Sequence, residues 1–168
     1  MSPQVHHCVL KALRIIGLED IRIHHLKLDD HYSIDVDYLH NKIAEDRKND
    51  LEPFMVIASA GTTDTGAIDP LQSIGKLCQK EKLWFHIDGA YGGFFILIPE
   101  KKALFKGIEM ADSLVIDPHK GLFLPYGLGA VLVKDKNAVF HSHHYKAYYM
   151  HDDYEDNIFN GADVSPEL

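Results

Sequence analysis

The chain has 168 residues, of which 46% are hydrophobic and 25% charged, a balance typical of a globular protein with a substantial core and unlike that of a disordered or fibrous one. Its 17 basic and 25 acidic residues give a formal net charge of −8. Because nucleic acids and anionic membranes attract basic surfaces, neither is an expected partner.

The longest apolar stretches, 90–98 and 121–133, are too short to cross a bilayer, which takes about 20 residues. The two cysteines, Cys8 and Cys78, lie in apolar segments with a helical pattern. We interpret them as reduced thiols of a soluble cytoplasmic protein, with a disulfide as the alternative.

The first third of the chain predicts two helices separated by a strand. Apolar residues recur at helical spacing over 5–16 and are followed by Gly17, a residue that often ends a helix in the left-handed conformation. Alternation over 21–28 predicts a short strand. Residues 36–44 place their apolar side chains on one face of a helix.

The central part of the chain repeats strand and helix. In order, the pattern predicts a strand over 54–60, a helix over 70–80 that begins at Pro70, a strand over 83–88, a helix over 99–110 and a strand over 113–117. All three strands are apolar enough to be buried on both faces. This alternation predicts an α/β fold with a mostly parallel sheet flanked by helices, whose ligands bind beyond the carboxyl ends of the strands.

The remainder of the chain predicts a strand pair and a tail. Segments 122–124 and 130–134 are expected to pair through a turn at 125–127. No periodicity follows, so we divide the chain into a main segment over 1–140 and a mobile tail over 141–168.

Two of the predicted strand ends carry residues suited to cofactor chemistry. Lys120 follows the strand over 113–117, and a partly desolvated lysine there is a candidate Schiff-base nucleophile, although an isolated surface lysine after a turn is the ordinary interpretation. Asp88 ends the preceding strand. Its carboxylate could keep a pyridine nitrogen protonated, as in enzymes that use pyridoxal 5′-phosphate (PLP), or could simply cap the next turn.

Taken together, the motifs of this chain resemble those of the PLP-dependent group II amino acid decarboxylases, in particular the aromatic-L-amino-acid decarboxylases. The motifs are Ser2-Pro-Gln-Val-His6, Gly61-Thr62-Thr63 with Asp69 downstream, His86-Ile-Asp88-Gly-Ala90-Tyr91-Gly92-Gly93, Ala111-Asp-Ser113, Pro118-His119-Lys120 and Ser165-Pro-Glu-Leu168. The resemblance implies the central part of the large domain of a type I, aspartate aminotransferase-like fold. It also implies a homodimer, and a full-length protein that adds an N-terminal part and a small C-terminal domain.

The resemblance assigns a role to each matching residue around the cofactor ring. Lys120 would bind PLP covalently and be displaced by the substrate amine, and Asp88 would pair with the ring nitrogen. His6 would stack on one face of the ring, while Ala90 would pack against the other. Outside the family context, His6 is more simply a polar residue at a helix N-terminus.

Further roles follow from the same resemblance. Thr63 would hydrogen-bond near the ring, although alone it is a turn hydroxyl, and His119 and Asp117 would lie by the phosphate. Tyr149 has the family's spacing from Lys120 to a loop tyrosine implicated in protonating the substrate carbon. Three nearby tyrosines offer other registers: Tyr145, Tyr148 and Tyr154.

Two other site types are disfavoured by the sequence. The histidine-rich segment 141–144, with His151 and the acidic pair 152–153, matches no zinc template, so we interpret it as solvated loop and expect no metal. Residues 127–129 carry two glycines but lack the strand and helix that a dinucleotide site needs.

The expected function is therefore PLP-dependent decarboxylation of an L-amino acid to an amine. Tyr91 after the Asp-Gly-Ala run favours an aromatic substrate, whereas Gly121 and Leu128 depart from the family pattern beside the site. Two alternatives remain: a PLP-dependent aldehyde synthase, and a non-catalytic remnant that acts only through binding.

Overall fold

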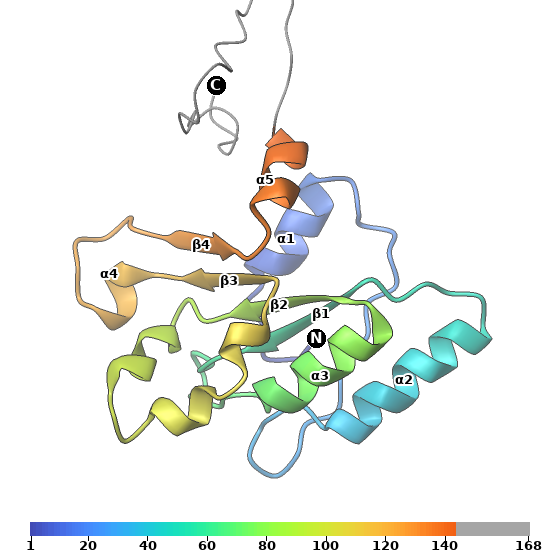
Figure 1. The fold of residues 1–168 in the computed structure, drawn as a ribbon, viewed down its shortest axis with the longest axis horizontal. Coiled ribbons are helices and arrows are strands. Elements are labelled where there is room, and N and C mark those ends of the chain that lie inside the picture. The colour runs from blue at the N-terminus through green and yellow to red at the C-terminus, as the bar shows by residue number, and fades with distance from the viewer. Residues whose placement is uncertain (144–168) are drawn as a thin grey trace, which may run out of the picture. The chain divides into compact units, whose positions relative to one another are not determined.

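The computed structural model describes residues 1–143 and shows an α/β arrangement (Figure 1). Contacts divide the chain into a compact unit over 1–132 and a second unit that begins at Val133. The second unit contains helix α5, Lys136–His143, so residues 141–143 of the expected tail are helical. Tyr149 and the rest of that tail lie outside the described residues.

A four-stranded sheet forms the centre of the first unit. Its strands are β1 (Met55–Ser59), β2 (Trp84–Asp88), β3 (Ser113–Ile116) and β4 (Ala130–Val133), in the order β1-β2-β3-β4. The pairs β1–β2 and β2–β3 are parallel, with Asp88 opposite Ser59 on one side and Val115 on the other. The expected α/β class with a mostly parallel sheet is confirmed, and the three parallel strands end at the same edge.

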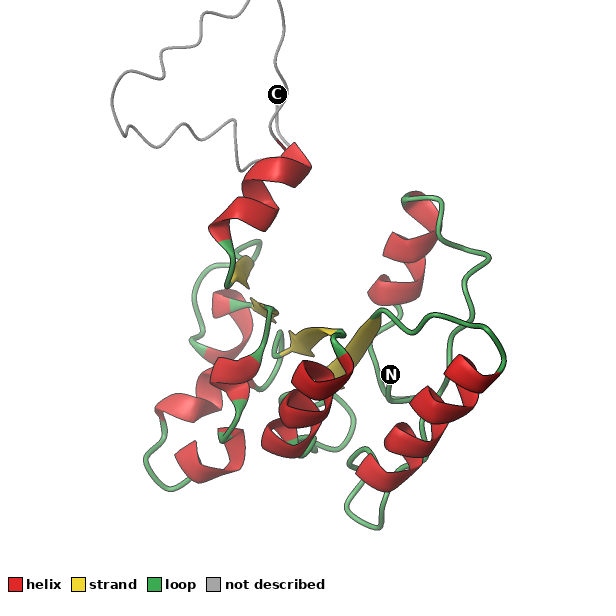
Figure 2. Ribbon diagram, turned by 45° about the vertical axis from the view of Figure 1, so that its right-hand side comes forward, coloured by secondary structure: helices red, strands yellow, loops and turns green. Residues whose placement is uncertain are grey.

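Helices lie on both faces of this sheet. Figures 1 and 2 show α2 (Val36–Lys48) and α3 (Leu71–Glu81) on one side and α1 (Cys8–Ile15) on the other. Gly17 follows α1 with a φ of 77°, the left-handed conformation expected of it. The prediction of these three helices is confirmed, with shifts of a few residues at their ends.

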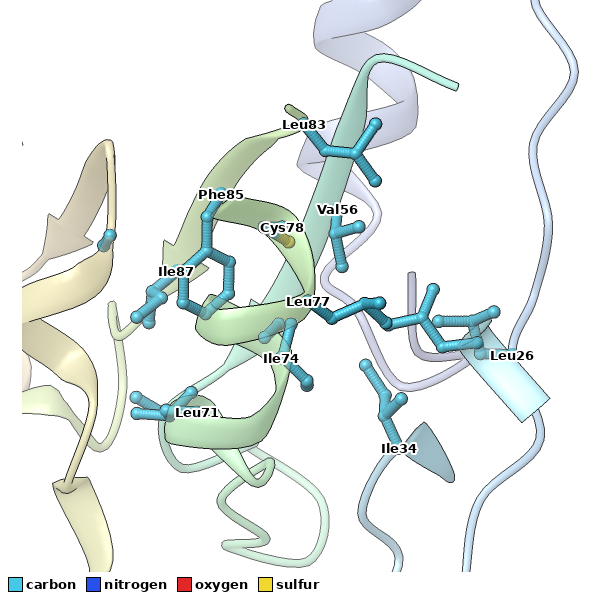
Figure 3. Packing of buried hydrophobic residues seen from close by; sticks show 14 of the residues in the cluster. Leu26, Ile34, Val56, Leu71, Ile74, Leu77, Cys78, Leu83, Phe85 and Ile87 are labelled. Atoms are coloured by element: carbon cyan, nitrogen blue, oxygen red, sulfur yellow. The ribbon is translucent and has the colours of Figure 1, made fainter. Parts of the chain in front are cut away.

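The core lies between the sheet and α3 (Figure 3). Phe85 and Ile87 of β2 are almost fully buried there, among Leu71, Ile74 and other apolar residues. The alternate residues of β2 are only half-buried, and in β3 only Ser113 is buried, so the prediction of burial on both faces is wrong for these two strands. One face of β2 therefore supports the fold and the other remains available to a ligand.

Two predicted strands in the first unit do not form. Residues 21–28 make only an isolated bridge, Leu28 with Ile34, because their backbone groups bond singly to separate segments instead of to one strand. Residues 122–124 form no strand, because Leu122 and Leu124 both donate their backbone N–H to the carbonyl of Pro118 and close a turn.

The predicted helix over 99–110 is replaced by short 3₁₀ segments. These are η2 (Lys102–Phe105) and η3 (Ile108–Met110), and a further 3₁₀ segment, η1 (Gly93–Leu97), precedes them. Gly107 breaks the run with a φ of 99° and packs against the start of α3, where a Cβ would lie 2.3 Å from the Gln72 nitrogen. A continuous helix would not allow this close approach.

Candidate functional site

Three loops that follow parallel strands converge at the carboxyl edge of the sheet. They are joined by backbone hydrogen bonds: Ala60 N–H donates to the Asp88 carbonyl at 2.7 Å, and Gly89 N–H donates to the Val115 carbonyl at 2.9 Å. This edge is where parallel α/β sheets bind ligands. The strand ends and the loops after them carry six of the predicted site residues: Thr63, Asp88, Ala90, Asp117, His119 and Lys120.

Lys120 lies in α4 (Pro118–Gly121), a single helical turn directly after β3 that the sequence analysis missed. Its Nζ lies 2.7 Å from Asp117 Oδ2, and its backbone N–H donates to the Asp117 carbonyl at 2.9 Å. The lysine side chain is 39% exposed, so a ligand can reach the amine. Asp117, which the family resemblance puts beside a phosphate, forms an ion pair with the Lys120 ammonium.

Asp88 ends β2 and is half-buried. Its Oδ1 accepts a hydrogen bond from the Ala90 N–H at 3.1 Å, which is the turn cap that the sequence also allowed. No donor to its other oxygen is found among residues 1–143. The carboxylate is therefore anchored by one oxygen and can accept a ring N–H with the other.

Two glycines hold the first two loops together. Gly61 has a φ of 93°, and a Cβ on Gly92 would lie 2.6 Å from the Gly61 Cα and 2.7 Å from the Ala60 carbonyl oxygen. Any side chain at Gly92 would therefore push the loops apart. The close approach fixes the loop of Thr63 against the loop of Ala90.

Thr63 lies in the loop after β1 and is exposed. Below it, the N–H groups of Gly61 and Thr62 both donate to the Ala67 carbonyl. The buried Asp69 carboxylate accepts hydrogen bonds from the N–H of Ser59 at 2.6 Å and of Ile34 at 2.8 Å. These bonds fix the base of the loop and leave the Thr63 hydroxyl open to a ligand.

His6 precedes α1 and is exposed. Its Nδ1 accepts a hydrogen bond from the Cys8 N–H at 3.3 Å, so it also has the helix-terminal role that the sequence allowed. Burial raises the pKa of the Cys8 thiol, as do the charges of Asp88 and Asp117, while Lys120 lowers it. The start of α1 is thus within electrostatic reach of the sheet-edge residues.

His119, next to Lys120, is held by the loop before β4. Its Nδ1 lies 2.5 Å from the Leu128 carbonyl oxygen, and the Tyr126 ring packs edge-on at 4.9 Å. A carbonyl only accepts, so Nδ1 carries the hydrogen and Nε2 is left for another partner.

Other features of the described chain carry none of the predicted site residues. An apolar cavity of about 280 Å³ lies between residues 21–26, α2 and residues 51–57, away from the sheet edge. Over 1–143, no three histidine, cysteine or acidic side chains gather as metal ligands, and no helix is long and apolar enough to cross a membrane.

The parallel sheet, with a lysine and a carboxylate at its carboxyl edge, is the fold of type I PLP-dependent enzymes. The sequence matches the pyridoxal-dependent decarboxylase conserved domain over residues 1–164, and the chain belongs to this family. The expected family and its cofactor class are confirmed.

Relatives within the family differ in substrate. The chain is 44% identical over 134 residues to an aromatic-L-amino-acid decarboxylase of Bacillus atrophaeus, covering 80% of this chain and 28% of that protein. It is 34% identical over 148 residues to an aspartate 1-decarboxylase of Aliivibrio fischeri, covering 88% and 27%. The chain therefore spans less than a third of these relatives.

Solved structures agree with this placement. The Oryza sativa TDC structure with PLP and tryptamine superposes with a TM-score of 0.86 at 26% identity, over 95% of this chain and 34% of that one. A Rhodiola rosea 4-hydroxyphenylacetaldehyde synthase gives a TM-score of 0.79 at 29% identity, over 84% and 31%.

Proposed function

We propose that the protein containing this chain is a PLP-dependent decarboxylase that releases CO₂ from an aromatic L-amino acid. The observation that supports the proposal most is that Asp88 ends β2 and Lys120 follows the neighbouring parallel strand β3, in a chain of this family. The aromatic substrate is supported by the Bacillus atrophaeus relative and by Tyr91, which is exposed directly after the Asp88 loop.

The residues at the sheet edge fit PLP. They offer a reachable amine on Lys120 and a carboxylate oxygen on Asp88, and His6, before α1, offers an exposed imidazole. When bound, PLP supplies an electron sink for the charge left on the substrate carbon as CO₂ departs. Lys120 would hold the cofactor covalently, Asp88 would pair with its ring nitrogen, and His6 and Ala90 would enclose the ring.

The other polar groups orient and hold protons. Asp117 Oδ2 accepts the Lys120 hydrogen and keeps the amine aimed at the edge. Thr63 would hydrogen-bond near the ring, and His119 would present Nε2 to the phosphate. Tyr149, outside the described residues, would return a proton to the substrate carbon. The working enzyme would be a cytoplasmic homodimer.

An assay of CO₂ release tests the proposal. The protein is offered tyrosine, tryptophan, histidine, aspartate and glutamate, with Lys120→Ala as the inactive control. Release from the aromatic substrates supports the proposal. Preference for aspartate or glutamate would rule out the aromatic assignment, and equal release by the Lys120→Ala variant would rule out the mechanism.

The Rhodiola rosea likeness favours a second candidate, an aldehyde synthase. Such an enzyme keeps the same cofactor residues and differs in the fate of the substrate carbon. Ammonia and hydrogen peroxide formed together with CO₂ would identify it, whereas an amine product would exclude it. A remnant that acts only through binding would release no CO₂ from any amino acid.

A further inference from the structure

A hydrogen-bonded group of three side chains lies on the half-buried face of β2, on the strand that carries Asp88. Trp84, His86 and Asp88 alternate along this face, while Phe85 and Ile87 between them point into the core. In the parallel ladder, Ser113 of β3 lies opposite His86. Neither His86 nor Ser113 has a role in the function proposed above.

Ser113 connects the other two side chains. Its Oγ lies 2.8 Å from the Trp84 indole Nε1 and 2.7 Å from His86 Nδ1. An indole N–H only donates, so Ser113 Oγ accepts from Trp84. The single serine hydrogen then goes to His86 Nδ1, since residues 1–143 show no other acceptor for it. The arrangement that gives every hydrogen an acceptor therefore has His86 as a neutral imidazole with its hydrogen on Nε2.

The surroundings of His86 favour this neutral form. Burial lowers the pKa of His86, and the negative charge of Asp88 opposes the effect. The residues opposite it on the neighbouring strands, Ile57 and Ser113, do not titrate. On the α1 side, Cys8 is a titratable group within electrostatic reach of Asp88.

We propose that Trp84, Ser113 and His86 form a positioning network that keeps an uncharged imidazole beside Asp88, so that the full charge of the carboxylate is available to a ring nitrogen. A proton on His86 would compete for that charge and weaken cofactor binding. The proposal rests on the proposed function for its purpose, but the network can be measured without cofactor.

The protein carries its own reporter, because Trp84 is the single tryptophan of the chain. Protonation of an imidazole that shares a hydrogen-bonded serine with an indole changes the indole fluorescence. A titration of the cofactor-free chain from pH 8 to pH 5 is therefore expected to show a change in Trp84 fluorescence as His86 takes up a proton. His86→Asn retains an acceptor for Ser113 but cannot titrate, and this variant is expected to lose the fluorescence transition.

Two further variants test the direction of each interaction. Ser113→Ala removes the donor to Nδ1 and is expected to move the transition to higher pH. Asp88→Asn removes the negative charge and is expected to move it to lower pH. His31→Asn, an exposed histidine far along the chain, is the matched control and leaves the transition unchanged. Far-UV circular dichroism confirms that each variant is folded.

Thermodynamic linkage makes the interaction between the two residues reciprocal. The charge of Asp88 favours a proton on His86, and a proton on His86 in turn interacts with the Asp88 carboxylate by the same free energy. In the PLP-loaded protein, lowering the pH from 8 to 5 is therefore expected to weaken PLP binding more in the wild type than in His86→Asn, because only the wild type gains a proton beside Asp88.

An unchanged transition in His86→Asn, or in both Ser113→Ala and Asp88→Asn, would overturn the network. Equal pH dependence of PLP binding in the wild type and His86→Asn would overturn its action on the cofactor. Failure of PLP to bind at any pH is a failure of the proposed function, and it is distinguishable because the cofactor-free fluorescence titration is unaffected.

Discussion

Lys120 Nζ and Asp117 Oδ2 form a 2.7 Å ion pair across one turn of chain at the carboxyl end of β3. Pro118 begins that turn, and the turn brings the Lys120 amine back to Asp117, the residue between β3 and α4. Lys120, which we propose binds the cofactor, is therefore held by its own neighbour Asp117, and this ion pair defines the position of the amine before any ligand binds.

Asp117→Asn should weaken PLP attachment with little effect on stability. The lysine is more than a third exposed, so loss of the pair should lower the free energy of unfolding by less than about 1 kcal/mol. Loss of the partner also frees the Lys120 side chain, so more PLP should be needed to reach half-saturation. Urea unfolding and a PLP titration measure the two effects; a loss of stability without any change in PLP binding would contradict this role.

Asp69→Asn should destabilise the fold by about 2–3 kcal/mol. Both oxygens of the buried carboxylate accept backbone N–H groups, and an amide would place an NH₂ against one of those donors. Asp64→Asn, at an exposed position in the same loop, is the control. Urea midpoints measure both variants, and equal midpoints would show that Asp69 does not fix the loop.

Gly121→Ala should destabilise α4, and a second substitution should restore it. A Cβ at Gly121 would lie 2.8 Å from the Phe94 Cβ, so overpacking should cost about 1–3 kcal/mol. Phe94→Gly in the same chain removes the Phe94 Cβ together with the ring and should recover part of the loss. A double-mutant cycle measures the coupling, with the exposed Phe95→Gly as control; strictly additive effects would contradict the contact.

The two thiols should differ in reactivity. Burial raises the pKa of Cys78 to about 12, so iodoacetamide should not label it until the chain unfolds. Cys8 is exposed, and the Asp88 charge helps raise its pKa, so labelling at pH 8 should be slow and should accelerate in Asp88→Asn. Peptide mass spectrometry reads both sites, and an unchanged Cys8 rate would place Asp88 out of reach of α1.

Acid should destabilise the fold partly through His86. Its folded-state pKa lies below the ordinary value of 6.5, so its contribution is present above that pH and is lost as the pH falls through the folded-state pKa. The urea midpoint of the wild type should therefore fall more between pH 7 and pH 5 than that of His86→Asn. Parallel pH profiles of the two proteins would contradict the assignment.

Strand and helix periodicity predicted the parts of the fold that depend on burial. The β1 run and the α3 pattern are apolar because they pack on each other, and so the sequence carries them directly. The prediction of a helix over 99–110 was wrong because a single close contact, Gly107 against Gln72, decides the conformation of this segment. The prediction of a strand over 122–124 was wrong because these residues form turn hydrogen bonds to Pro118 in place of strand pairing.

The sequence motifs predicted the main residues of the candidate site, and the structure added the contacts between them. Lys120 and Asp88 could be selected from the sequence because Asp88 ends one predicted strand and Lys120 follows the next. The partner of Lys120 could not be selected, because the four-residue α4 has no periodicity to reveal it. His86 and Ser113 are 27 residues apart and become partners only through the parallel register of β2 and β3.

The central claim, that this sheet edge holds PLP on Lys120, is tested most directly by trapping the attachment. The protein is incubated with PLP, reduced with borohydride and digested, and the modified lysine is located by mass spectrometry, with Lys106→Ala as the matched control for Lys120→Ala. One dominant label is expected, on Lys120, and it should be retained in the Lys106 variant and lost in the Lys120 variant. Labelling spread evenly over the surface lysines, or undiminished in Lys120→Ala, would contradict it.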